Sequence, residues 1–115
     1  MNGKRMWHRV PTLILAAGIT AMSLAGPAVA QSAGDAAAGK TKAGLCSACH
    51  GLAGISANPL WPNLAGQHQA YLAVQIRAYR DGEREEITMQ PFVQDLTDQD
   101  IEDLAAWYAS LSPCP

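Results

Sequence analysis

The stretch Cys46-Ser47-Ala48-Cys49-His50-Gly51, CSACHG in one-letter code, decides how the rest of the chain is interpreted. Two cysteines separated by two residues are followed at once by a histidine, and Cys-x-x-Cys-His is the attachment signature of a c-type haem. The spacing has a chemical reason, because two thiols one helical turn apart can add to the vinyl groups on neighbouring rings of a porphyrin. The adjacent imidazole is then placed beneath the iron. The stretch predicts one covalently attached haem c, held at Cys46, Cys49 and His50.

Two other chemistries also use paired cysteines. A thioredoxin-like redox pair would sit at the end of a strand in a βαβ unit, a context that this sequence lacks. A zinc site would need four ligands. His68 and Cys114 are available for that purpose, but they are isolated and do not form a second cysteine pair. Haem attachment is therefore favoured over both.

Residues 1–30 have the pattern of a cleavable secretory signal peptide. A basic start with Lys4, Arg5 and Arg9 is followed by an apolar run from about residue 10 to 25, and small residues precede a cleavage point after Ala30. An uncleaved membrane anchor is the alternative, but the apolar run is short of the roughly 20 residues that a bilayer requires. We therefore predict export to the periplasm and a mature domain covering residues 31–115.

The predicted mature domain is acidic and small. Five Lys and Arg and ten Asp and Glu remain after removal of the leader, which gives a formal net charge of −5. This charge argues against nucleic acid or an anionic membrane surface as a direct partner, and favours a protein partner with a basic patch. A domain of this size gains little stability from an apolar core alone, so a cofactor, a metal or disulfides would help. The mature chain has three cysteines, which cannot all pair with one another.

Strand-forming runs are scarce, and the sequence predicts an all-α fold of three main helices with long loops. The first helix is expected from the N-cap Asp35 towards Cys46, with Ala36, Gly39 and Ala43 forming a small face that would receive Trp107 or Tyr108. The second is expected at about 67–81, with Gly82 as its stop, and the third from a Thr97/Asp100 cap to before Pro113. The segments 51–66 and 83–96 are then long loops, which in compact domains usually have a function.

Six-coordinate iron needs a ligand on the face opposite His50. Met89 is the only methionine outside the predicted leader. Pro91 favours an extended backbone around it, which would let the thioether point inward. The alternatives are a gap-filling core role for Met89, or His68 as the sixth ligand, although His68 reads more simply as a solvated helix terminus. We predict His50 and Met89 as the two metal ligands.

The residues taken together resemble class I c-type cytochromes, and most closely a single domain of the small periplasmic bacterial cytochromes c that often occur as dihaem tandems. The resemblance covers residues 34–111 through the segments AAAGKTKAGLCSACHG, PNLAGQHQAYLAVQI, MQPF and LTDQDIEDLAAWYASL. It implies thioether bonds at Cys46 and Cys49 and axial ligation by His50 and Met89. It further implies that the carbonyl of Pro62 accepts a hydrogen bond from His50, as ligating histidines need an outer partner. Gly39 and Trp107 match the family's crossing of the first and last helices.

The resemblance leaves other positions open. Trp61, Gln67, Tyr71 and Arg80 are candidate contacts of the haem or its propionates, with ordinary packing or solvation as the alternative. The chain departs from the tandem pattern because it has one Cys-x-x-Cys-His, and Cys114 lies outside the haem pattern. This odd thiol could cross-link two proteins, or stay free or capped.

The function expected from these features is that of a monohaem electron carrier and not of an enzyme. A Met/His axial pair raises the reduction potential and leaves the iron six-coordinate in both oxidation states. The expected partners are redox protein donors and acceptors, and a membrane would be reached only through membrane-bound redox partners. The alternatives are the cytochrome subunit of a larger redox enzyme, and a haem-based ligand sensor in which a small gas displaces Met89.

Overall fold

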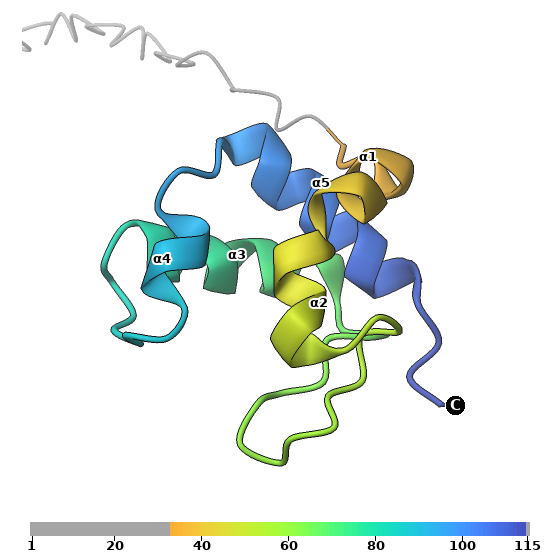
Figure 1. The fold of residues 1–115 in the computed structure, drawn as a ribbon. Coiled ribbons are helices and arrows are strands. Elements are labelled where there is room, and N and C mark those ends of the chain that lie inside the picture. Colours follow the sequence, from red (N-terminus) through yellow and green to blue (C-terminus); the bar gives the residue numbers. More distant parts are fainter. Residues whose placement is uncertain (1–32, 115) are drawn as a thin grey trace, which may run out of the picture.

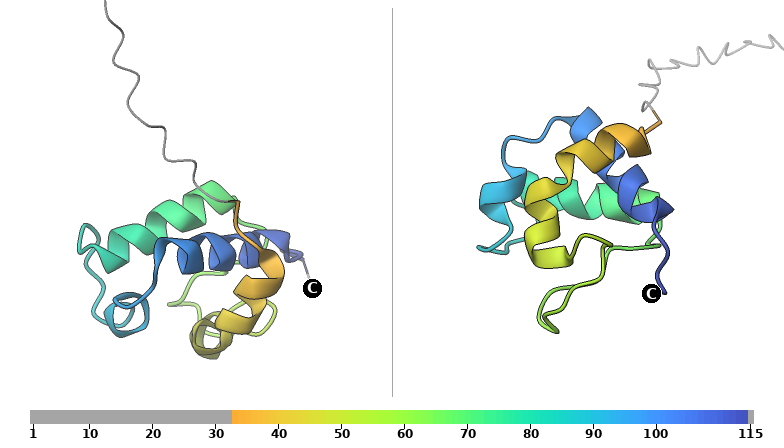
Figure 2. Two further views of the ribbon diagram at one scale, coloured as in Figure 1. Left: turned by 90° about the horizontal axis from the view of Figure 1, so that it is seen from above. Right: turned by 45° about the vertical axis from the view of Figure 1, so that its right-hand side comes forward.

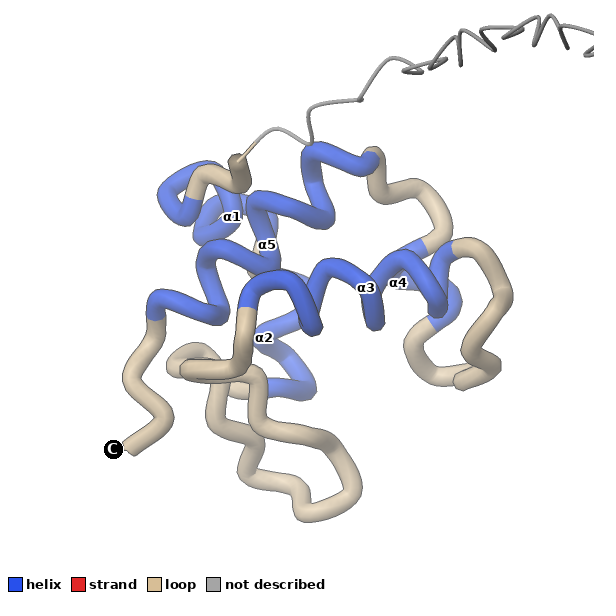
Figure 3. Tube along the Cα trace, turned by 180° about the vertical axis from the view of Figure 1, so that it is seen from behind, coloured by secondary structure: helices blue, strands red, loops and turns tan. Residues whose placement is uncertain are grey.

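The computed structural model describes residues 33–114, so the predicted signal peptide lies outside the described residues. The described part is helical and contains no strand, as expected. Its helices are α1 (Ala36–Lys42), α2 (Gly44–His50), α3 (Gln69–Arg80), α4 (Gln90–Val93) and α5 (Asp98–Ser110) (Figure 1). None of the helices in this part of the chain is long and apolar enough to cross a membrane. The long loops that connect α2 to α3 and α3 to α4 are drawn in tan in Figure 3.

Helix α5 is the centre of the packing, because α1 and α3 both lie against it (Figure 2). It begins as predicted, with the Thr97 hydroxyl accepting from the backbone N–H of Asp100 at 3.1 Å while the Asp100 carboxylate accepts from the backbone N–H of Thr97 at 3.0 Å. This reciprocal capping box satisfies two N–H groups that a helix start otherwise leaves unpaired. The core around α5 consists of Ala43, Leu72, Ala73, Ile101, Leu104, Ala105 and Tyr108.

The region expected to form the first helix is divided into α1 and α2. Asp35 caps α1 as predicted, its carboxylate accepting from the backbone N–H groups of Ala37 and Ala38 at 2.8 and 3.2 Å. At Ala43 the backbone N–H bonds to the carbonyl of Lys40, three residues back, at 3.4 Å. Such a tightened turn ends a helix, and Gly44 follows as a poor helix former. The division turns α2, with its two cysteines, away from the axis of α1 (Figure 1).

Gly39 lets α1 approach α5 closely. A Cβ at position 39 would overlap the backbone carbonyl of Asp103 and lie 2.8 Å from the Cβ of Trp107. Trp107 therefore occupies the small face of α1, as the resemblance implied, and the Lys40 ammonium lies 5.4 Å from the centroid of its ring. Asp103 joins the same two helices, because its buried carboxylate accepts from the backbone N–H of Asp35 at 2.8 Å and from the Lys42 ammonium at 2.6 Å.

Helix α3 ends as predicted, but the segment after it contains an unexpected helix. Asp81 is the C-cap of α3, and Gly82 follows with a φ of 77°, the left-handed conformation that a glycine adopts without strain. The expectation of an extended backbone around Met89 was wrong, because Met89 is the N-cap of α4 and has helical dihedral angles. Pro91 lies in the first turn of α4, where its missing N–H costs no hydrogen bond.

Candidate haem site

Helix α2 presents the cysteines and the histidine together. Cys46 and Cys49 are one turn apart and both are free thiols, and His50 is the buried last residue of the helix. Gly51 ends α2 with a φ of 82°, and a Cβ there would overlap the backbone carbonyl of Ile55. The chain therefore turns sharply at the end of CSACHG and folds back beneath His50. The helical setting does not match the strand end that a thioredoxin-like pair would need.

The loop after α2 fixes the ring of His50. Nδ1 of His50 lies 2.8 Å from the carbonyl oxygen of Pro62. Since a carbonyl can only accept, Nδ1 carries the proton and Nε2 keeps a free lone pair. The loop is held closed because the backbone N–H groups of Leu64 and Ala65 both donate to the carbonyl of Gly54, at 2.8 and 3.0 Å. The hydrogen bond that the resemblance implied for Pro62 is present.

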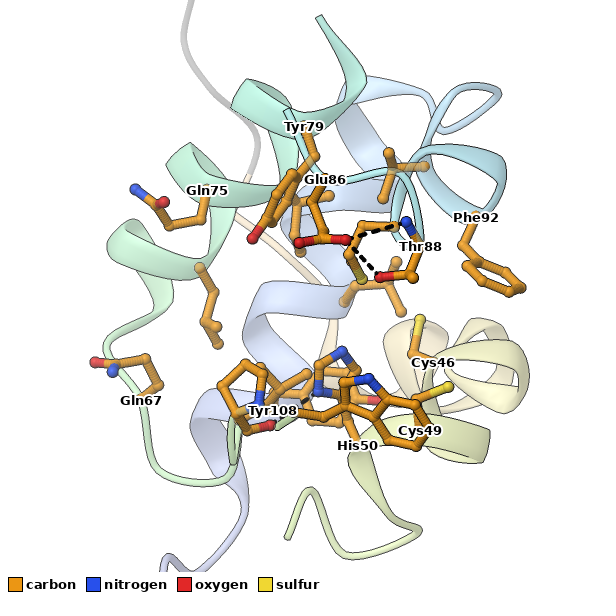
Figure 4. A pocket seen from close by; sticks show the side chains of 18 of the residues that line it. Cys46, Cys49, His50, Gln67, Gln75, Tyr79, Glu86, Thr88, Phe92 and Tyr108 are labelled. Atoms are coloured by element: carbon orange, nitrogen blue, oxygen red, sulfur yellow. Dashed lines mark hydrogen bonds between the residues drawn. The ribbon is translucent and has the colours of Figure 1, made fainter. Parts of the chain in front are cut away.

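A cavity of about 630 Å³ opens between α2 on one side and α3 and α4 on the other. Its volume lies within the range of cofactor pockets, roughly 300–1,000 Å³. In Figure 4, Cys46, Cys49 and His50 lie on one side and Tyr79, Glu86 and Thr88 on the opposite side. The side chains that line it are mostly apolar or aromatic, including Leu64, Leu72, Ile76, Val93, Leu96 and Leu104. An apolar cavity with two thiols and an oriented imidazole on one wall has the donor set and the space that a c-type haem requires.

All five residues singled out from the sequence line this cavity, namely Cys46, Cys49, His50, Pro62 and Met89. Met89 follows Thr88, which lies across the cavity from His50 in Figure 4. The competing ligands are placed elsewhere. His68 is the exposed N-cap of α3, and Cys114 is exposed in the C-terminal tail, and neither lines the cavity.

The cationic side chain of the cavity wall is Arg84, which the sequence did not single out. Its guanidinium donates to the side-chain oxygen of Gln75 at 2.5 Å and lies 4.6 Å from the centroid of the Tyr79 ring. Arg80, which the resemblance offered as a propionate contact, is not part of the cavity wall and bonds to Asp81 and Asp98 at 2.7 and 2.8 Å. Arg84 lies two residues after Gly82, the glycine that ends α3. The chain turns back towards the cavity at this point, and this turn brings Arg84 to the cavity wall.

Three further candidate contacts, Trp61, Gln67 and Tyr71, also line the cavity, and so do Glu86 and Thr88. The carboxylate of Glu86 accepts from the hydroxyl and backbone N–H of Thr88 at 2.8 and 3.2 Å. These two hydrogen bonds hold the pKa of Glu86 below its ordinary value, so it is an anion at neutral pH.

Tyr108 is the second cavity residue whose position the sequence did not predict. The expectation placed either Trp107 or Tyr108 on α1, and Trp107 takes that place while Tyr108 enters the cavity wall. Tyr108 is only 2% exposed. Burial raises its pKa to about 12, so the phenol keeps its proton. Burial also raises the pKa of the neighbouring Cys46 thiol.

Comparisons with known proteins point to one family. Residues 36–112 match the model of the family described as Cytochrome c. Cytochrome c-554(548) of Halomonas halodenitrificans is 52% identical over 81 residues, which cover 68% of this chain and 98% of that protein. The crystal structure of reduced cytochrome c4 from Pseudomonas stutzeri superimposes with a TM-score of 0.67 at 39% identity, over 70% of this chain and 47% of that one.

A third likeness is to part of a larger protein. Thiosulfate dehydrogenase from Marichromatium purpuratum gives a TM-score of 0.63 at 34% identity, over 68% of this chain and 19% of that one. The chain thus spans nearly the whole of the Halomonas cytochrome and about half of cytochrome c4. With the family match extending from α1 to just beyond α5 and the paired cysteines and histidine in one cavity, the chain belongs to the cytochrome c family, whose members carry covalently attached haem c.

Proposed function

We propose that this protein is a periplasmic carrier of single electrons with one haem c, bonded through Cys46 and Cys49 and ligated by His50 and Met89. The observation that carries the proposal is that these four side chains line one cavity, with the carbonyl of Pro62 bonded to the far nitrogen of His50. Haem, when bound, supplies one-electron redox chemistry, and a Met/His axial pair sets its potential high.

The chain's own residues prepare the site for this chemistry. The carbonyl oxygen of Pro62 accepts a hydrogen bond from Nδ1 of His50, which fixes the orientation of the ring and directs the Nε2 lone pair into the cavity. The buried side chains of Leu72, Val93 and Leu104 in the wall exclude water, which favours the less charged state of a bound redox centre. With His50 and Met89 both holding the iron, electron transfer would need little rearrangement of the protein.

Redox partners dock at the exposed edge of the cavity. Leu45, Leu60 and Phe92 line the cavity and are also 68%, 84% and 44% exposed, so they mark where a bound ring comes closest to solvent. Small apolar contact areas of this kind suit brief redox encounters. The exposed glutamates Glu83 and Glu85 lie close along the chain to the cavity residue Glu86, and they steer partners with basic patches. The rate of electron transfer with such a partner should fall steeply with added salt. A rate that does not change with salt would exclude electrostatic steering.

The ligand assignment is tested by optical spectroscopy of the haem-loaded protein. We expect the weak far-red band of methionine-to-ferric-iron ligation at neutral pH, and its loss in Met89→Ala, together with rapid binding of carbon monoxide to the reduced variant. His68→Ala is the matched control and should keep the band. A wild-type protein without the band, or a band lost in the His68 variant, would contradict the assignment of Met89.

Export and haem attachment are tested together by denaturing mass spectrometry of the secreted protein. The expected mass is that of a chain beginning at Gln31 with one haem added. A colourless product whose Cys46 and Cys49 both react with an alkylating reagent, made in a host able to mature c-type cytochromes, would overturn the proposal.

A second candidate function is that of a cytochrome subunit in a larger redox enzyme. The likeness to part of a thiosulfate dehydrogenase favours it. Purification of the native protein at low salt separates the two, because a subunit should elute in a stable complex with a second polypeptide and a free carrier should elute alone. The ligand-sensor alternative predicts rapid carbon monoxide binding by the reduced wild type at neutral pH, which a carrier with both axial positions filled should not show.

A further inference from the structure

Arg84 is a cation of the cavity wall that has no acidic partner among residues 33–114. Arg77 and Arg80, the other two arginines of this part of the chain, both form ion pairs with carboxylates. The Arg84 guanidinium instead donates to the side-chain oxygen of Gln75 at 2.5 Å and lies 4.6 Å from the centroid of the Tyr79 ring. These neutral partners fix the direction of the cation without neutralising it, so the cavity wall keeps an oriented site for an anion.

The chemistry of haem decides where an anion of the cofactor would lie. A haem has vinyl groups on two neighbouring pyrrole rings and propionate carboxylates on the other two, so the carboxylates point away from the edge that is bonded to the cysteines. In Figure 4, Cys46 and Cys49 lie at one end of the cavity, and Gln67 and Gln75 lie at the other. Because Gln75 holds Arg84, the free donors of the guanidinium are at the end that the carboxylates would reach.

The segment that carries Arg84 also carries Met89. Residues 81–88 are all exposed, and α4, which begins directly after Met89, packs mainly against α3. Arg84 attaches this segment to α3 through its side chain and through its backbone N–H, which donates to the carbonyl of Ala78 at 2.9 Å. A segment with few buried contacts opens at little cost in free energy. A bond from Arg84 to the cofactor would therefore hold the segment over the cavity.

We propose that Arg84 binds a propionate carboxylate of the haem and thereby holds the segment that carries Met89 against the cofactor. The inference rests on the proposed function, because it needs both the haem and its ligation by Met89. A guanidinium presents paired N–H groups that match the two oxygens of a carboxylate, and Gln75 accepts from Nη1 alone. The acidic residue of the wall, Glu86, bonds to Thr88 and leaves the guanidinium available.

Resonance Raman spectroscopy of the haem-loaded protein tests the contact directly, because the bending mode of the propionates depends on their hydrogen bonds. Arg84→Gln should shift this band. Arg80→Gln removes the same charge four residues away, outside the cavity wall, and should leave the band in place. An unchanged band in Arg84→Gln, or an equal shift in both variants, would overturn the inference. A lower reduction potential with an unchanged band would mean that Arg84 acts only as a distant charge.

Carbon monoxide binding to the reduced protein tests the hold on Met89, because the gas binds only when Met89 leaves the iron. We expect binding to Arg84→Gln to be roughly two- to fivefold faster than to the wild type, as the loss of a partly exposed ion pair implies. Gln75→Leu removes the neutral support of the guanidinium and keeps its charge, so it should give a smaller increase. A wild-type rate in Arg84→Gln, or an equal increase in both variants, would contradict the role of the haem contact.

Two measurements on the wild type separate the failure of this inference from the failure of the proposed function. Denaturing mass spectrometry reports whether haem is attached, and the far-red band reports whether Met89 is a ligand. If either is missing, the proposed function fails and the inference fails with it. If both are present and Arg84→Gln behaves as the wild type does, only the role of Arg84 is wrong.

Discussion

The contact between Gly39 and α5 makes a quantitative prediction about stability. In Gly39→Ala the new Cβ would overlap the carbonyl oxygen of Asp103 and stand 2.8 Å from the Trp107 Cβ, where ordinary contacts begin near 3.4 Å. The carbonyl belongs to the backbone of α5 and cannot rotate away, so α1 must move. By contrast, a Cβ at Gly44 would meet nothing within 4 Å.

The cost follows from the contacts that a shift of α1 disturbs. Overpacking of a close interface costs about 1–3 kcal/mol. Displacement also stretches the hydrogen bonds from Asp35 and Lys42 to the carboxylate of Asp103, 2.8 and 2.6 Å long, and bonds to a charged group contribute about 1.5–3 kcal/mol each. Alanine recovers about 1 kcal/mol through its helix propensity. The net expectation is a loss of about 2–4 kcal/mol for Gly39→Ala, and for Gly44→Ala a change of about 1 kcal/mol or less, in the stabilising direction.

Urea unfolding of the haem-loaded proteins, followed by far-ultraviolet circular dichroism, measures both changes. Linear extrapolation gives the free energy of unfolding, and equal slopes for the three proteins allow their midpoints to be compared directly. Haem content should be the same in both variants because neither glycine lines the cavity. If the two glycine variants unfold at the same midpoint, the close approach of α1 to α5 is not limiting and the reasoning fails.

Other predictions concern charged groups. Asp103→Ala should cost about 1–3 kcal/mol, because the backbone N–H of Asp35 is left without its acceptor; thermal melts would show this, and a melting temperature equal to that of wild type would contradict it. Hydrogen bonds from Lys42 and Thr97 lower the pKa of Asp100 to about 2. The stabilisation from the ionised Asp100 carboxylate is therefore present above its ordinary pKa near 4 and is lost as the pH falls towards 2. Between about pH 5 and pH 2 the melting temperature should fall less steeply in Lys42→Met than in the wild type. Arg84→Gln removes a cation from the cavity wall and should lower the reduction potential, whereas Arg80→Gln, outside that wall, should not.

The parts of the molecule that the sequence predicted are those determined by local chemistry. The Asp35 cap, the Thr97/Asp100 box and the Gly82 stop depend on residues a few positions apart, and all three are present. The positions of Cys46, Cys49 and His50 on one helix follow from the motif itself.

The features that the sequence did not predict depend on how the chain returns to the cavity. Pro91 was interpreted as an element of extended structure, but a proline is equally suited to the first turn of a helix, and α4 uses it there. Arg84 and Arg80 are both basic residues near the end of α3, and only the path of the loop brings one of them to the cavity wall. Trp107 and Tyr108 are adjacent on α5, so periodicity could not decide which of them would meet α1.

The partner of His50 has a consequence for how the protein tolerates sequence change. The acceptor is a main-chain carbonyl, and the loop around it is closed by the bonds of Leu64 and Ala65 to Gly54. No single side-chain replacement can delete an oxygen that belongs to the peptide backbone. The electronic character of the imidazole is thereby protected against most point mutations, and evolution could alter it chiefly by inserting or deleting residues in the loop.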